Sequence, residues 1–244
     1  MNHKAGNHRP GYHKAGRQLA LDLPLRAALG RDDFLVTPSN EAAVAMIDRY
    51  PAWPSFAMVL LGAPGSGKSH LLEVWRQASG AQLISAVNLA MAALDQLPPG
   101  AALAIDEAPG PKLNELALFH LFNLARQTGG HVLIATETHP VTWPVALPDL
   151  ASRLKALPVA ILQPPDDLLL RGVLVKLFAD RQLAVEEHVV SYLMLRMPRS
   201  LEVARGLVAE IDRLGLEEKS AITRPLVARV LQQMTEPGLF SEEG

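Results

Sequence analysis

The segment that most constrains the fold of this chain is Gly62-Ala-Pro-Gly-Ser-Gly-Lys68-Ser69, which fits the phosphate-binding loop pattern G-x-x-x-x-G-K-[ST]. Its glycines, Gly62, Gly65 and Gly67, let the backbone curl so that consecutive N–H groups can point at phosphate oxygens. Lys68 can reach the β- and γ-phosphates, and the Ser69 hydroxyl can ligate Mg²⁺. The loop therefore predicts a nucleotide-binding α/β fold.

The segments on either side of the loop have the character that such a site requires. Residues 56–61 form an apolar run that predicts a buried parallel strand, and residues 70–75 predict a helix. That helix would place its positive N-terminal end at the phosphates. The alternative, a chance match in a glycine-rich turn, is disfavoured because the strand and the helix both flank the loop.

Composition excludes several classes of protein. The 244 residues, 49% of them apolar, suffice for one large domain or for a medium domain with a small one. The absence of cysteine excludes disulfide and thiol chemistry. No apolar run reaches the roughly 18 residues of a membrane span, and the N-terminus lacks a signal-peptide core, so we expect a cytoplasmic protein without membrane contact. A net charge of −2 argues against a dedicated nucleic-acid binder, whose surface is usually basic.

Further apolar runs alternate with helical patterns after the loop. We expect strands at 81–85, 101–105, 131–136 and 156–162, helices at 41–49, 87–97 and 113–127, and a turn with a short helix at 147–153. Together with the strand at 56–61, these segments predict a parallel five-stranded sheet flanked by helices.

Two carboxylates, Asp106 and Glu107, directly follow the apolar run 101–105. The carboxyl end of a buried strand is where an α/β sheet places its site. Asp106 is expected to hold Mg²⁺ together with Ser69, and Glu107 to orient or deprotonate the attacking water. Thr136, Glu137 and Thr138 form the polar tip of the strand 131–136, where a polar group can touch the γ-phosphate or that water. An apolar run followed by an acid is a weak motif alone, and it gains force from the phosphate-binding loop.

The pattern changes at Pro164, after which strands stop. Four helical segments follow at 167–182, 186–195, 199–214 and 224–234, and they predict a small all-helical domain. Gly215 is expected to end the third of these helices. Arg199, at the start of that helix, is placed to project from the bundle toward a neighbouring site.

The N-terminal region contains a segment that allows two interpretations. Residues 1–17 are polar and cannot build a core, so we expect a flexible tail. In the segment that follows, Gln18-Leu-Ala-Leu-Asp-Leu23, the leucines Leu19, Leu21 and Leu23 would lie on one side of an extended chain. Such a segment either docks into the pocket of a partner or packs on its own domain, and the pattern alone does not choose between these.

Taken together, the loop, the acidic strand end, the arginine-containing turn and the helical region resemble an AAA+ module with a small helical lid. Over about residues 33–234 the chain is more specifically similar to the DnaA replication-initiator family. Four segments carry the similarity: Phe34-Leu-Val-Thr-Pro-Ser-Asn40 before the nucleotide site, Gly67-Lys-Ser-His-Leu-Leu72 in the GK[ST]HLL form, Phe119-His-Leu-Phe-Asn123 as the FHxFN helix, and Leu150-Ala-Ser-Arg-Leu154 as the arginine-finger box.

The resemblance implies a role for each matching residue. The adenine pocket would be lined by Leu35, Val36 and Asn40. The phosphates and Mg²⁺ of a bound ADP or ATP would be surrounded by Gly62, Gly65, Ser66, Gly67, Lys68, Ser69 and His70. Arg199 would contact phosphate from the lid, and Arg153 would be an arginine finger that reaches the nucleotide of a neighbouring subunit.

Two features of the chain differ from the DnaA family and indicate a smaller group of related proteins. The chain ends where the DNA-binding domain of the family would begin, and residues 18–23 resemble the QLxLxL motif by which bacterial proteins bind the replicative sliding clamp. These features resemble the regulatory inactivators of DnaA. The resemblance implies a negative regulator of replication initiation that binds the clamp (the β subunit of the DNA polymerase) through Gln18, Leu19, Leu21 and Leu23 and reaches DNA only indirectly. It would present Arg153 to ATP-bound DnaA, whose ATP is then hydrolysed.

Other functions remain open at this point. A helicase loader of the DnaC-like AAA+ group shares the ATPase motifs but needs no clamp peptide. A non-catalytic adaptor would use nucleotide only to fix its fold and residues 18–23 to recruit a partner. Turnover of ATP by the chain itself and a homodimer are also left open. The expected organisation is a tail with the clamp motif at 1–32, an AAA+ domain at 33–163, a lid at 164–234 and a fraying end at 235–244.

Overall fold

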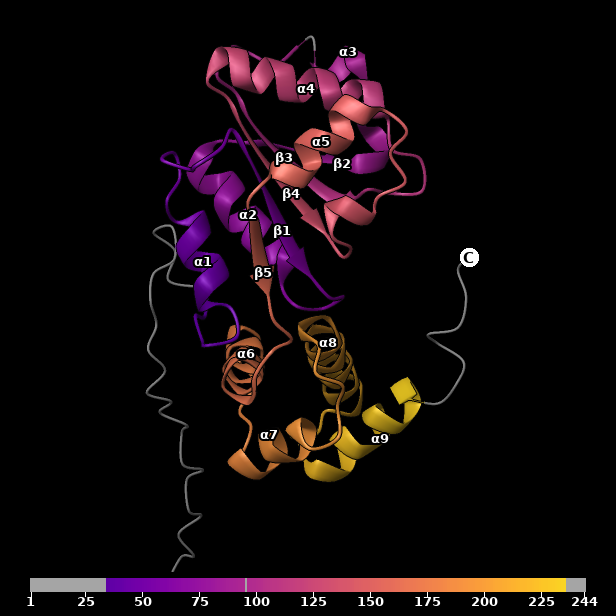
Figure 1. The fold of residues 1–244 in the computed structure, drawn as a ribbon. Helices are drawn as coiled ribbons and strands as arrows, with labels where there is room; N and C mark the ends of the chain where they lie inside the picture. Colours follow the sequence, from indigo (N-terminus) through magenta and orange to yellow (C-terminus); the bar gives the residue numbers. More distant parts are fainter. Residues whose placement is uncertain (1–33, 95, 236–244) are drawn as a thin grey trace, which may run out of the picture.

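The computed structural model describes residues 34–94 and 96–235, and it contains a five-stranded parallel sheet that confirms the predicted fold class (Figure 1). The strands are β1 (Ala57–Gly62), β2 (Gln82–Ser85), β3 (Ala102–Ala108), β4 (His131–Thr136) and β5 (Val159–Leu162). Their order across the sheet is β2-β3-β4-β1-β5. Because all pairs are parallel, the ends of β1, β3 and β4 lie at one edge of the sheet. The N-terminal segment 18–23 lies outside the described residues.

Helices cover both faces of the sheet (Figure 1). One face packs on α1 (Glu41–Ile47) and α2 (Lys68–Ser79), and the other on α3 (Met91–Leu94), α4 (Glu115–Thr128) and α5 (Pro148–Ala156). The short 3₁₀ helices η1 (Ala86–Asn88) and η2 (Pro140–Thr142) connect these elements. Since β1 is buried on both faces, it is a continuous apolar run rather than an alternating one.

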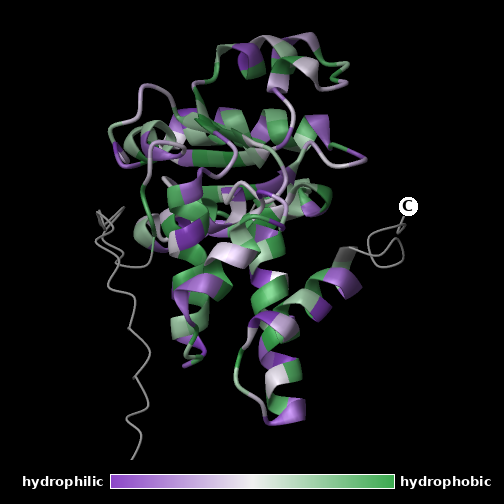
Figure 2. Cartoon of the chain, turned by 90° about the horizontal axis from the view of Figure 1, so that it is seen from below, coloured by the Kyte–Doolittle hydropathy of each residue, from purple (hydrophilic) through white to green (hydrophobic). Residues whose placement is uncertain are grey.

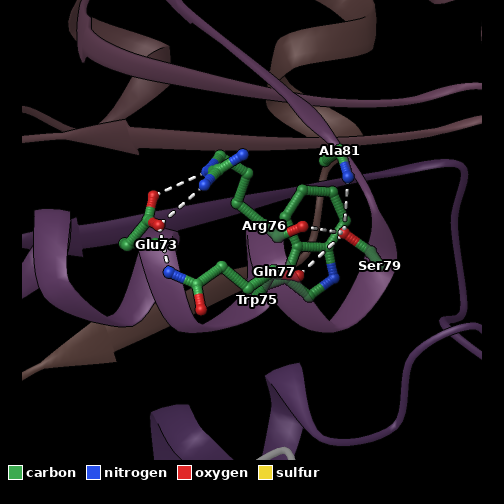
Figure 3. Close-up of polar contacts among 6 residues, drawn as sticks. All are labelled: Glu73, Trp75, Arg76, Gln77, Ser79 and Ala81. Carbon is green, nitrogen blue, oxygen red and sulfur yellow. Dashed lines mark hydrogen bonds and ion pairs between the residues drawn. The ribbon is translucent and has the colours of Figure 1, made fainter.

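The helix after the phosphate-binding loop, α2, is stabilised along its exposed side and ended by glycine (Figure 3). The Glu73 carboxylate accepts hydrogen bonds from Arg76, at 2.6 and 2.8 Å, and from Gln77. The Ser79 hydroxyl donates to the carbonyl of Trp75 at 2.7 Å. Gly80 then adopts a left-handed conformation (φ 70°), which stops the helix and turns the chain into β2.

Four helices form the lid: α6 (Asp167–Asp180), α7 (Glu187–Met194), α8 (Leu201–Glu218) and α9 (Arg224–Thr235). They pack around a hydrophobic core that is separate from the two cores of the sheet. Figure 2 shows hydrophobic and hydrophilic residues alternating along these helices, as expected of helices with one buried face. Within 34–94 and 96–235, no helix has the length and apolarity that a membrane crossing requires.

Two predicted elements differ from those in the structure, one because of packing and the other because of a proline. The helix predicted at 87–97 is replaced by η1 and the four-residue α3. Leu89 and Leu94 are both buried, and a continuous helix would turn them about 140° apart, so the break lets both reach the core. The strand predicted at 156–162 begins only at Val159, because Pro158 disfavours helix at Leu157 and separates α5 from β5.

The prediction that Gly215 ends the third lid helix is wrong. α8 continues to Glu218, and Lys219 ends it with a left-handed backbone (φ 48°). Gly215 is instead required for packing, since a Cβ there would lie 2.9 Å from Cδ1 of Ile222. The strand β3 also extends past the end predicted at residue 105, and it contains both Asp106 and Glu107.

One carboxylate joins the sheet domain to the lid. Asp166 accepts hydrogen bonds from the backbone N–H of Leu169 at 2.7 Å and from that of Ser39 at 3.1 Å. It thereby caps α6 and ties the segment before α1 to the lid. Burial alone would raise the pKa of Asp166, but hydrogen bonds from Leu169, Thr37 and Ser39 outweigh burial and lower it below its ordinary value.

We expect Asp166→Asn to lower the free energy of unfolding by about 1 kcal/mol at pH 7, because hydrogen bonds to a charged acceptor are stronger than those to a neutral one. A lowered pKa in the folded state means that the contribution is complete above the unfolded-state pKa of about 3.9 and is lost as the pH falls through the folded value. The gap between variant and parent should therefore stay constant from pH 7 to about 5 and shrink below about 4. Urea titrations followed by tryptophan fluorescence measure it.

The matched control is Asp167→Asn. Asp167 is the next residue, and its side chain is 70% exposed in an ion pair with Arg199. Its loss should change stability by less than about 0.5 kcal/mol. Equal effects of the two substitutions at pH 7 would contradict the role given to Asp166.

Candidate nucleotide-binding site

The phosphate-binding loop connects the end of β1 to the start of α2 and has the backbone that its glycines allow. Gly65 and Gly67 have φ values of 68° and 100°, in the left-handed region that favours glycine. A Cβ on Gly62 would lie 2.5 Å from the Ser66 hydroxyl oxygen. Ser66 is itself 3% exposed, and its Oγ has no hydrogen-bond partner among the described residues. A buried polar atom of this kind fits a loop that receives a polar ligand.

Lys68 is the first residue of α2 and is held at the mouth of the loop. Its Nζ donates to the Ala63 carbonyl at 3.0 Å and lies 3.5 Å from Oε1 of Glu137, just after β4. Only 9% of Lys68 is exposed, whereas the Glu137 side chain is 56% exposed. Ser69, the next residue of α2, is exposed. The parallel sheet thus brings the predicted lysine and the strand-tip acid into contact.

The two carboxylates of β3 are directed differently. The pairing of β3 with β4 shifts register between Ile105 and Ala108, and Glu107 has a left-handed backbone with φ 60°, a strained conformation for a residue with a side chain. Asp106 Oδ1 accepts from the backbone N–H of Glu107 at 2.9 Å. Glu107 Oε2 accepts from the Ser85 hydroxyl at 3.0 Å. Because β2 lies on the far side of β3 from β1, the Glu107 carboxylate lies toward β2 and away from the loop.

A cavity of about 270 Å³ lies between the loop, the segment before α1 and the lid. It is lined by Phe34, Leu35, Asn40, Ser66, Gly67, His70, Leu169, Val173, Lys176, Leu177, Asp180, Leu201 and Arg205. Five residues that sequence analysis assigned to the site therefore meet here: Leu35, Asn40, Ser66, Gly67 and His70. The His70 ring packs edge-on against Phe34, with centroids 5.2 Å apart.

Asn40 holds the backbone of the cavity wall in place. Its Oδ1 accepts from the N–H of Thr37, and its Nδ2 donates to the carbonyl of Leu35, both at 2.9 Å. Because the side chain is 3% exposed and its amide is used in this way, Asn40 fixes the segment that presents Leu35. Val36 does not line the cavity and packs in the core beneath the sheet.

The lid contacts the loop directly through the start of α8. The backbone N–H of Leu201 donates to the carbonyl of Gly65 at 2.8 Å. A Cβ on Gly65 would lie 2.0 Å from the Ser200 hydroxyl oxygen, and one on Gly67 would lie 3.2 Å from Cδ1 of Leu201. Arg199, just before this contact, does not line the cavity and pairs with Asp167 at 2.7 Å. The glycines of the loop therefore also permit the close approach of the lid.

Arg153 lies outside the cavity, on α5, and is fixed by α4. Its Nη1 donates to Asn123 Oδ1 at 2.7 Å, and its guanidinium carbon lies 4.3 Å from the centre of the Phe119 ring. Glu115, at the start of α4, accepts hydrogen bonds from Ala146 and from Leu147 (2.7 Å) just before α5. α4 thus fixes both the segment before α5 and the side chain of Arg153. This positioning role of Phe119 and Asn123 was not predicted from the sequence.

The residues on the lid side of the cavity were not predicted from the sequence. Leu169, Val173 and Leu177 recur at intervals of four residues on α6, and Leu201 and Arg205 do so on α8. This spacing indicates one helix face, but the core of the lid uses the same spacing. Only the contact between α8 and the loop distinguishes the two faces.

The arrangement can bind an anion next to an apolar cavity. The loop offers backbone N–H groups and a helix N-terminus, and Lys68 adds a positive charge. No group of three His, Cys, Asp or Glu side chains that could hold a metal occurs within 34–94 and 96–235. A Mg²⁺ ion bound with phosphates needs only one or two protein ligands, for which Ser69 and Asp106 suffice in number.

The chain resembles several known proteins in sequence or in structure. No protein-family model matches the sequence. An uncharacterized protein of Haemophilus influenzae is 27% identical over 182 residues, which are 70% of this chain and 79% of that protein. Domain III of the replication initiation protein DnaA of Thermotoga maritima superposes with a TM-score of 0.72 at 20% identity, over 88% of this chain and 100% of that one.

Two longer proteins contain the same arrangement. AMPPCP-bound DnaA from Aquifex aeolicus superposes with a TM-score of 0.60 at 20% identity, over 80% of this chain and 68% of that one. The Holliday junction branch migration motor RuvB of Thermotoga maritima has a TM-score of 0.60 at 18% identity, over 79% of this chain and 65% of that one. These likenesses show that the chain has an AAA+ fold of the kind found in DnaA domain III and RuvB.

We expect Gly65→Ala to destabilise the protein by at least about 1 kcal/mol more than Gly80→Ala. Both glycines have similar left-handed φ values, 68° and 70°, so the backbone cost of about 1 kcal/mol is shared. Only at Gly65 does the added Cβ meet another residue, Ser200, since no atom lies within 4 Å at Gly80. Urea unfolding of the two variants measures the difference.

Ser200→Gly supplies the rescue, because it removes the atoms at 2.0 and 2.8 Å from the new Cβ. Ser200 caps α8 by accepting from the N–H of Val203 at 3.2 Å, and glycine at such a position costs only a few tenths of a kcal/mol. The double variant Gly65→Ala, Ser200→Gly should therefore be more stable than Gly65→Ala alone. If Ser200→Gly gave no recovery, the close approach of lid and loop would not explain the requirement for Gly65.

Proposed function

We propose that this chain is an AAA+ nucleotide-binding protein that holds ADP or ATP between the phosphate-binding loop and the lid. The observation that supports this proposal most directly is that Gly67, which has a left-handed backbone, and the buried Ser66, whose hydroxyl has no partner among the described residues, line the same 270 Å³ cavity as residues of the lid. The AMPPCP-bound DnaA of Aquifex aeolicus has the same fold and supports this ligand class.

Different residues around the cavity would bind different parts of the nucleotide. Backbone N–H groups from Gly65 to Lys68 and the Lys68 ammonium would meet the phosphates. Ser69 and Asp106 would hold Mg²⁺, which supplies charge neutralisation between the phosphates. The base would enter the apolar part of the cavity, beside Leu35. Breaking the 3.5 Å contact with Glu137 would free Lys68 for this role.

We further propose that the protein is a negative regulator of replication initiation, acting like Hda-type inactivators on the ATP bound by DnaA. Arg153 is the residue on which this depends. It lies outside the cavity of its own chain, and the 2.7 Å hydrogen bond that it donates to Asn123, together with the ring of Phe119, fixes its direction. An arginine that is fixed before docking loses little entropy when it meets the γ-phosphate of a neighbour.

The segment Gln18–Leu23 would attach the protein to the sliding clamp on DNA, so that contact with DNA is indirect. The support is the alternation of Leu19, Leu21 and Leu23 after Gln18, which suits an extended peptide in an apolar pocket. A near-neutral net charge of −2 agrees with indirect contact.

One observation favours the adaptor as a second candidate. The Glu107 carboxylate is bound to Ser85 and lies away from the loop, so the hydrolytic water would lack its base in this arrangement. An adaptor that binds nucleotide without turnover needs no such base. The helicase-loader alternative gains no specific support from the described residues.

We expect Arg153→Ala to reduce the stimulation of ATP hydrolysis on DnaA at least 100-fold, because an arginine finger stabilises the charge of the transition state and is worth about 10³–10⁵ in rate. The measurement is release of radiolabelled phosphate from ATP-bound DnaA in the presence of clamp-loaded DNA and this protein. Arg153→Lys, which keeps the charge but not the planar fork, should recover only a small part.

Arg196→Ala is the matched control. Arg196 also stacks on an aromatic ring, that of Tyr192 at 4.0 Å, but it lies on the lid. This variant should stimulate hydrolysis as the parent does. Undiminished stimulation by Arg153→Ala would refute the finger and favour the adaptor.

We expect the double variant Gln18→Ala, Leu21→Ala to lose binding to the immobilised clamp, because both substitutions remove side chains that would enter the clamp pocket. Surface plasmon resonance measures the affinity, and calorimetry with ADP provides the control. Nucleotide affinity should be unchanged, since residues 18–23 are distant in sequence from the loop. Equal clamp binding by parent and variant would assign these leucines to packing on their own domain.

A further inference from the structure

Two exposed arginines of the lid lie over one tyrosine ring. The guanidinium carbon of Arg196, just after α7, lies 4.0 Å from the centre of the Tyr192 ring. That of Arg224, the first residue of α9, lies 4.7 Å from the same centre. The face of an aromatic ring attracts a cation, but two cations at one ring also repel each other. A negatively charged group between them would relieve this repulsion.

Most cations of the lid have an acidic partner, and these two arginines do not have one among residues 34–94 and 96–235. The acid that is nearest to Arg224 in sequence, Glu218, pairs with Arg229 at 2.7 Å. Glu187, on the same helix as Tyr192, pairs with Arg171. The described residues therefore leave both guanidinium groups available to an anion from elsewhere.

The surface beside Arg196 is apolar as well as positively charged. Leu195 is 80% exposed, the largest exposed fraction among the large hydrophobic side chains of the described residues. A single exposed leucine indicates nothing by itself. Next to two arginines without acidic partners, it indicates a ligand that combines apolar side chains with carboxylates. α7 and α9 lie on the side of the lid away from the sheet, so such a ligand would not enter the nucleotide cavity (Figure 1).

The segment 236–244, which follows α9 and lies outside the described residues, has this chemistry. Its sequence is Glu236-Pro-Gly-Leu-Phe-Ser-Glu-Glu-Gly244, with three acids and no lysine or arginine. The apolar pair Leu239-Phe240 comes shortly before the acidic pair Glu242-Glu243. Residues 1–33, which also lie outside the described part, contain six lysines and arginines against three aspartates. Charge complementarity therefore favours the segment after α9.

The length of this segment allows it to reach the arginines. α9 has 12 residues and is about 18 Å long, and Arg224 lies at its start. The segment must therefore return over the length of the helix. Pro237-Gly238 is a dipeptide that favours a turn. Residues 239–243 span up to about 17 Å when extended, and the arginine and glutamate side chains add several ångström to this reach.

We propose that the segment 239–243 folds back along α9 and docks on the arginine–tyrosine surface, which we define as Tyr192, Leu195, Arg196 and Arg224. Glu242 and Glu243 would pair with the two arginines, and the apolar pair before them would cover Leu195. The docked segment would join α7 to α9 and close this surface to other acidic peptides. This inference goes beyond the proposed function and does not depend on nucleotide binding.

Disulfide formation between two introduced cysteines tests the proposal on the full chain, which has no cysteine of its own. Leu195→Cys with Ser241→Cys places one thiol on the surface and the other in the segment. In a glutathione buffer, the fraction of intramolecular disulfide gives the effective concentration of the two thiols. We expect about tenfold more than for the control pair Leu216→Cys with Ser241→Cys, since two ion pairs and an apolar contact favour docking. Leu216 is 71% exposed, also lies on the lid, and is closer to residue 241 in sequence.

Reversal of charge distinguishes docking from mere proximity. In the Leu195→Cys, Ser241→Cys background, Arg196→Glu with Arg224→Glu should lower the effective concentration to that of the control pair. Glu242→Arg with Glu243→Arg should do the same. A variant with all four reversals has opposite charges again, so its effective concentration should rise above that of either reversed pair. Structural damage to the lid would give no such recovery, and circular dichroism verifies that each variant is folded.

Several outcomes would overturn the inference. Equal effective concentrations for the two cysteine pairs would show that the segment does not dock on this surface. Failure of the four reversals to restore it would refute the charge pairing. Disulfide-linked dimers in place of the intramolecular bond would assign the segment to a second copy. ADP affinity should be equal in all variants, because none of the changed residues that the structure describes lines the cavity; a change would place the segment at the cavity instead. If the parent does not bind ADP, the proposed nucleotide site fails and the docking of the segment is still decided by the disulfide measurement.

Discussion

The hydrogen bond from the Leu201 N–H to the Gly65 carbonyl is the contact on which the rest of the site depends. It joins two regions with separate hydrophobic cores, the sheet domain and the lid, at the loop itself. The cavity exists because this contact and the Asp166 hydrogen bonds hold α8 and α6 over the segment before α1. The glycines of the loop therefore satisfy two requirements at once, a left-handed backbone and an approach that no Cβ would allow.

Parallel strand order explains why residues far apart in sequence meet. β4 lies between β1 and β3, so the ends of these three strands carry the loop, Glu137 and the Asp106–Glu107 pair at one edge. The register shift in β3 and the left-handed backbone of Glu107 fall at this edge as well. Strain of this kind persists only where the surrounding structure over-determines it. It turns the Glu107 carboxylate toward Ser85, a direction that strand order alone would not give.

Helices and strands were predicted correctly from the sequence where the pattern of apolar residues has a single physical cause. The apolar runs of β1 and β4 have the length and composition of buried strands. Both strands lie where predicted, β1 with a shift of one residue. Prediction failed where tertiary contacts decide: Leu89 and Leu94 break a helix to reach the core, and Gly215 packs against Ile222 inside a helix. Arg205 could not be found because its spacing on α8 does not reveal which face meets the loop. Residues 18–23 lie outside the described residues, and their role stays a prediction.

The position of Phe34 limits how far residues 18–23 can lie from the cavity. Phe34 packs on His70 and lines the cavity, and it directly follows the ten residues 24–33 that separate it from Leu23. A chain of ten residues spans at most about 35 Å, so a body that held residues 18–23 would stay within that radius of the cavity wall. Residues 24–33 therefore join the described part of the chain at the wall of the cavity. If a ligand in the cavity shifted Phe34, the affinity for that ligand and the affinity for such a body would depend on each other by thermodynamic linkage.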